Sequence, residues 1–192
     1  MSDYGHLADE SVREFMIAAH QDLERVKTVL AEHPELLNIR YRWGEGNTET
    51  PLGAAAHVGN REIAEYLLAQ GAPLTICAAA TLGRAGDVAR FLEEDPAQAQ
   101  ATGAHNIPLM LHVALGGRVD IAQMVVTHGG GGAAALNLLL HVATARGEKE
   151  LVAWALVQGA DPAATNNKGQ TPLQVAREQG HEEIAALLAE QE

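Results

Sequence analysis

The sequence predicts an all-α solenoid, a row of six helix pairs that bury their apolar faces against one another. Apolar residues make up 47% of the chain but aromatic residues only 4%, so the core must be built from small aliphatic side chains, which favours closely packed helices. An apolar triplet at positions i, i+3 and i+4 recurs six times, and this spacing places three side chains on one face of a helix. The first members of the triplets are Val26, Ile63, Val88, Ile121, Leu151 and Ile184.

The spacing of the triplets indicates a repeat. Successive first members are 37, 25, 33, 30 and 33 residues apart, which clusters near 33. A helix-breaking Pro or Gly follows each of the first five triplets, eight residues after its first member. A short Ala-rich segment precedes each triplet and is expected to form a thin first helix that lets neighbouring units approach closely. These segments are 17–19, 54–56, 77–80, 112–114, 141–143 and 175–176.

We therefore predict a single domain over residues 1–192, with the first and last units acting as caps. The short spacing of 25 residues before the third unit predicts that its connecting finger is missing or trimmed. The predicted units are 11–38, 47–74, 75–102, 103–131, 132–163 and 166–192.

Several short motifs resemble the ankyrin repeat. They are Thr50-Pro51-Leu52, Thr171-Pro172-Leu173, the run Gly-His-Glu-Glu-Ile at 180–184, and Gly-Ala at 71–72 and 159–160. In such a motif the Thr suits the start of the first helix and the Pro suits its opening turn. The resemblance is strongest at 47–74 and 137–192 and weakest at 75–131. It implies an ankyrin-type helix-pair solenoid with short or degenerate β-hairpin fingers, and a structural hydrogen bond from His112 and from His141.

Charge and cysteine content narrow the range of partners and of cellular locations. The formal net charge is −12, so nucleic acid and anionic membranes are not expected as partners. The longest apolar run, 133–143, is too short to span a bilayer. A single cysteine and a start without the basic and apolar regions of a signal peptide predict a cytoplasmic protein.

The sequence shows no arrangement typical of catalysis or of metal binding. No two histidines are spaced as His-x-x-x-His and there is only one cysteine, so we expect neither a metal site nor a cofactor. Cys77 lies in an Ala-rich segment and is expected to pack as a small core residue. The glycines at 129–132 lack a following Lys-Ser/Thr and are expected to form a flexible link rather than a phosphate loop. We therefore do not expect an enzyme.

The segment between the first two units holds the main candidates for binding a partner. Arg40, Tyr41, Arg42 and Trp43 are residue types that are common at interface hot spots, and they would project as the first finger. Alternatively, the two aromatic side chains fold back onto the solenoid. Further candidates lie near the ends of the first helices, and these are His20, Gln21, His57, Val58 and Arg146.

The leading functional prediction is a protein-interaction module, such as a regulator, inhibitor or scaffold, that binds another protein through its concave groove and fingers. One alternative is a small-molecule, metal-binding or enzymatic site at the degenerate fourth and fifth units, lined by His105, His112 and His141. Another is a structural protein that self-associates through exposed apolar surface. We expect a monomer.

Overall fold

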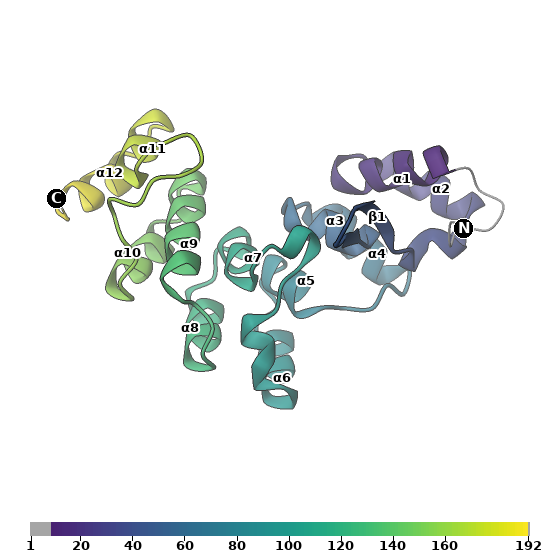
Figure 1. The fold of residues 1–192 in the computed structure, drawn as a ribbon, viewed down its shortest axis with the longest axis horizontal. Coiled ribbons are helices and arrows are strands. Elements are labelled where there is room, and N and C mark those ends of the chain that lie inside the picture. The colour runs from purple at the N-terminus through teal and green to yellow at the C-terminus, as the bar shows by residue number, and fades with distance from the viewer. Residues whose placement is uncertain (1–8, 192) are drawn as a thin grey trace.

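The computed structural model describes residues 9–191 and shows a mostly helical chain in which six antiparallel helix pairs form an elongated, curved row (Figure 1). The first helices of the pairs are α1 (Asp9–Gln21), α3 (Pro51–His57), α5 (Ile76–Thr81), α7 (Leu109–Gly116), α9 (Ala133–Arg146) and α11 (Pro172–Glu178). The second helices are α2 (Leu23–Glu32), α4 (Arg61–Ala69), α6 (Ala85–Glu94), α8 (Val119–Thr127), α10 (Lys149–Val157) and α12 (Glu182–Ala189). The predicted helix-pair solenoid is confirmed; the boundaries drawn between repeats stay a prediction.

Three threonines cap the N-termini of first helices, and the sequence predicts this role for Thr50 and Thr171. The hydroxyls of Thr50, Thr75 and Thr171 each accept a hydrogen bond from the backbone N–H three residues further on. Thr171 and Gln174 complete a reciprocal capping box at the start of α11. Thr75 follows the end of α4 after only a short loop, so the third unit has no hairpin finger, as its spacing predicts.

The apolar triplets form the core between the helices. All six first members are buried, with at most 2% of their surface exposed. Trp154 packs partly buried beside the core, and its Nε1–H donates to Gln123 Oε1 at 3.1 Å, consistent with a packing role. The polar residues of the last unit are exposed, as expected of a cap; they are Gln174, Arg177, Glu178, Glu182 and Glu183. Most of the polar N-terminal segment lies outside the described residues.

Two glycines mark places where backbones approach closely. A Cβ atom on Gly116 at the end of α7 would overlap the carbonyl oxygen of Ala80 in α5. A Cβ atom on Gly130 would overlap the Ala99 carbonyl oxygen and the Val125 side chain. Gly130 is therefore packed closely against its neighbours, whereas a Cβ atom on Gly129 or Gly132 would meet nothing within 4 Å; the flexible link stays a prediction.

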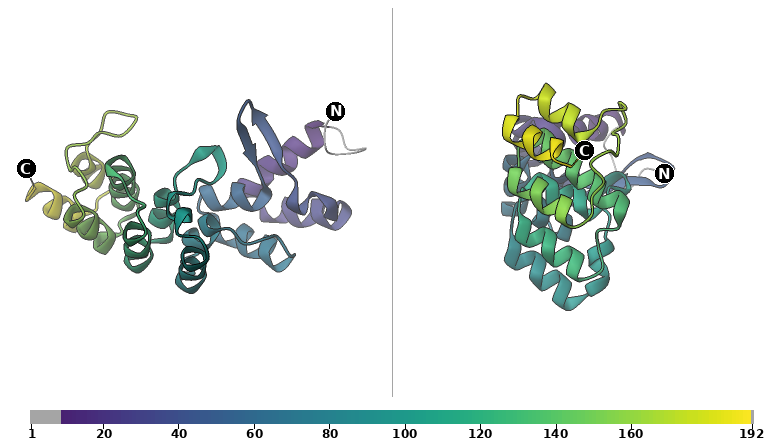
Figure 2. Two further views of the ribbon diagram at one scale, coloured as in Figure 1. Left: turned by 60° about the horizontal axis from the view of Figure 1, so that its bottom comes forward. Right: turned by 90° about the vertical axis from the view of Figure 1, so that its left-hand side faces the viewer.

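The finger of the second unit is a β-hairpin formed by β1 (Tyr41–Gly44) and β2 (Asn47–Glu49). Short 3₁₀ helices lie in the connecting segments. They are η1 (Pro34–Asn38), between α2 and β1, and η2 (Pro96–Gln100) and η3 (Ala104–Asn106), between α6 and α7. Figure 2 shows that the hairpin and the segment before α7 project from the same side of the row. The η3 turn packs against both β2 and α3, so the connection into the fourth unit reaches back to the base of the hairpin.

Within residues 9–191, every helix is too short or too polar to cross a bilayer.

Candidate functional site

The two faces of the hairpin differ, because side chains alternate along a strand. Tyr41 pairs with Glu49 across the hairpin, and both are buried against the solenoid. Arg42 pairs with Thr48 on the opposite face, where both are exposed, and Arg40 is exposed as well. The hairpin thus presents arginines outward and directs aromatic and acidic side chains inward.

On the inward face, Tyr41 and Trp43 fold back onto the solenoid, which is the alternative that the sequence left open. Tyr41 is only 5% exposed and stacks edge to face on Trp43, with ring centroids 4.9 Å apart. Trp43 is half-buried, and its Nε1–H donates to Glu49 Oε2 at 2.7 Å. The two aromatic residues therefore hold the hairpin on the solenoid, and a partner would find little of Tyr41 to contact.

Glu49 lies at the centre of a group of histidines. Its side chain is fully buried at the end of β2, immediately before the cap of α3. His57 Nδ1 lies 2.9 Å and His105 Nε2 3.4 Å from Oε1, while His20 Nε2 lies 3.6 Å from Oε2. We call these four residues, His20, Glu49, His57 and His105, the His/Glu cluster.

Two members of the cluster occupy the same place in successive units. His20 lies in the last turn of α1 and His57 in the last turn of α3, and their rings meet edge to face with centroids 5.0 Å apart. Their positions are 37 residues apart, the same separation as between the first members of the first two triplets. Stacking of the repeats therefore brings the two imidazoles together.

His105 comes from a different kind of segment, the turn that precedes α7. His105 and Asn106 both adopt left-handed backbone conformations, with φ of 55° and 56°. Such residues cost about 1–3 kcal/mol each unless their surroundings hold them. The amide of Asn47 holds the ring at Nδ1, 2.8 Å away, which aims Nε2 at Glu49. The strained turn thus places His105 on the solvent side of Glu49.

The charge of Glu49 is stabilised by its neighbours although the carboxylate is buried. Burial alone would raise the pKa of Glu49, but the close contact with His57, the hydrogen bond from Trp43 and the charge of His20 together hold it below its usual value. Oε1 nevertheless receives no hydrogen bond of good geometry from the described residues. The carboxylate is therefore ionised and only partly paired.

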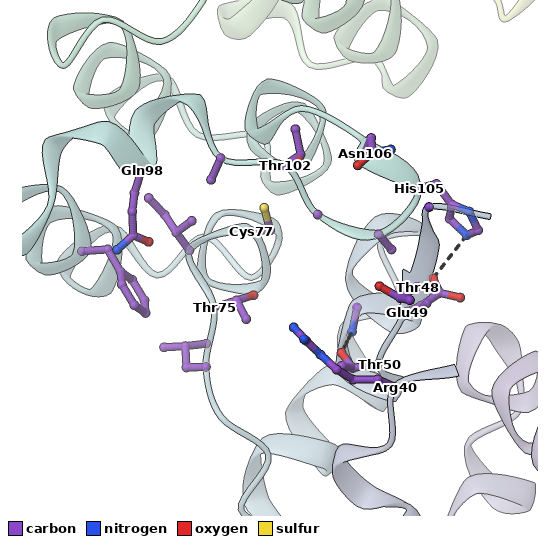
Figure 3. A pocket seen from close by; sticks show the side chains of 18 residues that line it. Arg40, Thr48, Glu49, Thr50, Thr75, Cys77, Gln98, Thr102, His105 and Asn106 are labelled. Carbon is purple, nitrogen blue, oxygen red and sulfur yellow. Dashed lines mark hydrogen bonds and ion pairs between the residues drawn. The ribbon is translucent and has the colours of Figure 1, made fainter. Parts of the chain in front are cut away.

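A half-open cavity of about 510 Å³ lies beside the cluster. Figure 3 shows Arg40 extending into it, with Glu49 and His105 on its edge and Thr75 and Cys77 on the opposite wall. Burial raises the pKa of the Cys77 thiol to about 12, so this cysteine is a core residue, as predicted, and not a nucleophile at neutral pH. The cavity is open enough to accept a segment of another molecule.

The remaining predicted contacts fall in two places. Gln21 and Val58 are exposed beside His20 and His57, at the helix ends near the hairpin. Arg146 is exposed at the end of α9, separated from the hairpin by the intervening helix pairs (Figure 1). The structure therefore gathers all the predicted contacts except Arg146 around the hairpin.

The alternative site lined by three histidines is not formed. His112 is buried, with Nδ1 3.1 Å from Thr81 Oγ1, and His141 Nε2 lies 2.9 Å from the carbonyl oxygen of Ala164. Only His105 reaches the cavity. Both histidines have the predicted structural role. His141 bonds the backbone directly. His112 has a hydrogen bond with the Ala56 backbone and also contacts Thr81, whose hydroxyl donates to the Ala56 carbonyl oxygen.

Sequence reasoning placed His20 and His57 among the partner contacts and His105 in the alternative site, and it did not identify Glu49. The spacing criterion for metal binding considered histidines on one helix, whereas the cluster draws one residue from each of α1, β2, α3 and η3. The repeat spacing shared by His20 and His57 was the signal that could have found the pair.

The fold defines a helix-pair repeat protein with a hairpin finger, and comparison with known families agrees. Residues 47–79 match the family model described as ankyrin repeat, and residues 140–192 match the model described as ankyrin repeats in three copies. The chain belongs to the ankyrin repeat family. No curated protein matches it.

Proposed function

We propose that this chain is a binding module that captures a segment of a partner protein in the cavity between the hairpin and residues 101–106. Ankyrin repeats are typically protein-interaction modules, which supports the class of function. Two exposed arginines support the location: Arg42 lies on the outer face of the hairpin, and Arg40, just before β1, lines the half-open cavity.

The chemistry of this surface indicates what kind of segment would fit. The chain carries 25 acidic and 13 basic residues, so a finger that presents Arg40 and Arg42 is a local exception. Arginine binds carboxylates in a bidentate manner and is enriched at interface hot spots. The partner segment is therefore expected to place an Asp or Glu side chain against the hairpin.

The proposed role is binding rather than catalysis. The cavity wall offers Cys77 as its only thiol in the described part of the chain, and that thiol is protonated at neutral pH. The single reduced cysteine fits the cytoplasm, where we propose that the protein acts. Regulator, inhibitor and scaffold all remain consistent with a module of this kind.

Arg42→Ala is expected to weaken partner binding at least about tenfold, because hot-spot arginines commonly contribute 2 kcal/mol or more. The partner would first be captured from lysate and identified by mass spectrometry, and its affinity for purified wild type and variant would then be measured by calorimetry. Arg42 is exposed, so the variant is expected to fold normally.

Arg177→Ala is the matched control, since Arg177 is also exposed but lies on α11 in the last unit. It should leave the affinity unchanged. If Arg42→Ala binds as tightly as wild type while Arg177→Ala or Arg146→Ala weakens binding, the contact surface lies elsewhere on the solenoid and the proposal fails.

A further inference from the structure

We propose that the His/Glu cluster is a binding site for one Zn²⁺ ion. His20, Glu49, His57 and His105 each offer one ligand atom, and these four atoms all lie within 4.8 Å of one another. The proposal goes beyond partner binding and does not depend on it.

The dimensions of the cluster fit a tetrahedral site. Bonds of about 2.1 Å from zinc to imidazole nitrogen or carboxylate oxygen place neighbouring ligand atoms about 3.4 Å apart. The distances from the Glu49 oxygens to His57 Nδ1, His105 Nε2 and His20 Nε2 are 2.9, 3.4 and 3.6 Å. Small movements of side chains would therefore complete the coordination.

The hydrogen bond of His20 explains why a cation fits there. Its Nδ1 lies 2.8 Å from the carbonyl oxygen of Met16, which can only accept, so Nδ1 carries the proton. The charged ring places a proton on Nε2 that faces Glu49 Oε2; when that proton leaves, Nε2 presents a lone pair towards Oε2, which is also an acceptor. A metal ion between them turns this repulsion into coordination, and a backbone carbonyl on the second ring nitrogen is the usual arrangement for a zinc-bound histidine.

His105 has a comparable support. The Asn47 amide lies against its Nδ1 and can present either its nitrogen or its oxygen there. When the amide oxygen faces the ring, Nδ1 carries the proton and the Nε2 lone pair is free to bind the ion. The strained turn at 105 and 106 holds the ring over Glu49 in this position.

His57 offers Nδ1 as the remaining ligand atom. Its Nδ1 lies near both the Gly53 carbonyl oxygen, at 3.2 Å, and Glu49 Oε1. Zinc binds a deprotonated nitrogen, so in the zinc complex Nδ1 would carry no proton and the ring proton would lie on Nε2.

The donor set selects the ion. Three imidazoles and one carboxylate suit Zn²⁺, whereas Ca²⁺ and Mg²⁺ prefer sites made of oxygen ligands. The ion would also neutralise the buried carboxylate, whose Oε1 lacks a well-formed hydrogen bond from the described residues. His105 is one-third exposed and borders the cavity, which gives the ion a path into the site.

Zinc in this position would join α1, the hairpin, α3 and the η3 turn, four elements that come from different parts of the chain. The competing explanation is that a proton on one imidazole compensates Glu49 and that no metal binds. The two explanations predict different results at pH 7.5. A metal site would retain added zinc, whereas a cluster compensated by a proton would retain none.

The test uses the full chain without an affinity tag, stripped with a chelator and titrated with Zn²⁺ at pH 7.5. Native mass spectrometry and calorimetry are expected to show one tightly held ion per chain, with Kd below about 1 µM, and the melting temperature should rise with free zinc. Retention of no ion, or only weak binding of several ions, would overturn the proposal and leave the proton as the compensating charge.

Two variants and a control locate the ion. His105→Gln changes a residue on an exposed turn and should weaken zinc binding at least about 100-fold while the helical circular dichroism stays unchanged. Glu49→Gln should weaken zinc binding to the same extent if the variant folds. His128→Gln removes an exposed histidine whose Nδ1 also lies against a carbonyl oxygen, that of Met124, and it should bind zinc as wild type does. Wild-type affinity in His105→Gln would place the ion elsewhere and refute the site.

Discussion

Gly116→Ala is expected to lower the free energy of unfolding by about 3 kcal/mol, the upper end of the usual cost of overpacking. The new methyl group would overlap the carbonyl oxygen of Ala80, which belongs to the backbone of α5 and cannot turn away as a flexible side chain could. The contact between α5 and α7 joins the N-terminal units to the C-terminal ones. Separating these helices therefore weakens the middle of the solenoid.

Urea unfolding monitored by circular dichroism measures this effect. Gly86→Ala is the control, because Gly86 lies in α6 and a Cβ atom there would meet nothing within 4 Å. Since Ala favours helix over Gly, this variant should be slightly more stable than wild type, by less than about 1 kcal/mol. Equal stability of Gly116→Ala and Gly86→Ala would show that α5 and α7 do not pack as described.

The second large expected effect is a dependence of the free energy of unfolding on pH, which arises from His112. Burial above all, together with the electrostatic effect of the nearby His57, lowers the pKa of His112 from 6.5 to about 4, although a hydrogen bond with the Ala56 backbone acts in the opposite direction. Its Nδ1 lies against the hydroxyl of Thr81, and its Nε2 has no partner among the described residues and faces the Gly103 backbone. A proton added to Nε2 would therefore be buried without an acceptor.

The sign of the effect follows from this lowered pKa. Between about pH 4 and pH 6.5 the unfolded chain binds a proton at His112 that the folded chain excludes, so the free energy of unfolding falls as the pH falls. From pH 7 to pH 5 this residue is expected to account for a loss of about 2 kcal/mol. Above pH 7 it contributes no pH dependence.

His112→Gln removes the titrating group while keeping an amide that can bond Thr81. Urea unfolding at pH 7 and at pH 5 should show that wild type loses about 2 kcal/mol more than the variant over this interval. Comparing the two proteins cancels the contributions of Glu49 and of the exposed histidines. Equal losses in the two proteins would mean that His112 is not excluded from protonation in the folded state.

The helices were predictable from the sequence because their signals are local. Each apolar triplet defines one helix face, and caps such as Thr50 and Thr171 define where helices begin. The missing finger before α5 was also predictable, since the 25-residue spacing leaves no room for a hairpin. These inferences need only neighbouring residues and the repeat length.

The His/Glu cluster was not predictable in the same way because it depends on how the connecting segments fold. His105 reaches Glu49 only because residues 105 and 106 adopt left-handed conformations that are uncommon for residues other than glycine. The inward direction of Trp43 follows from the hairpin register, which pairs Tyr41 with Glu49. A shift of one residue would exchange the arginines and the aromatic residues between the two faces.

The His/Glu cluster and the proposed binding surface both include residues of the hairpin. Glu49 supports Trp43 from below the hairpin, and the opposite face of that hairpin carries Arg42. The cavity between the hairpin and the η3 turn includes both Glu49 and His105 on its edge. The interactions that hold the His/Glu cluster together therefore also fix the shape of the surface that a partner would meet.

Hydrogen exchange on the chain, free and bound to its captured partner, tests the proposed binding surface most directly. The account predicts new protection of backbone amides in residues 40–49 and 101–106, with little change in α11 and α12. Protection confined to the C-terminal units, with the hairpin exchanging as in the free protein, would contradict it.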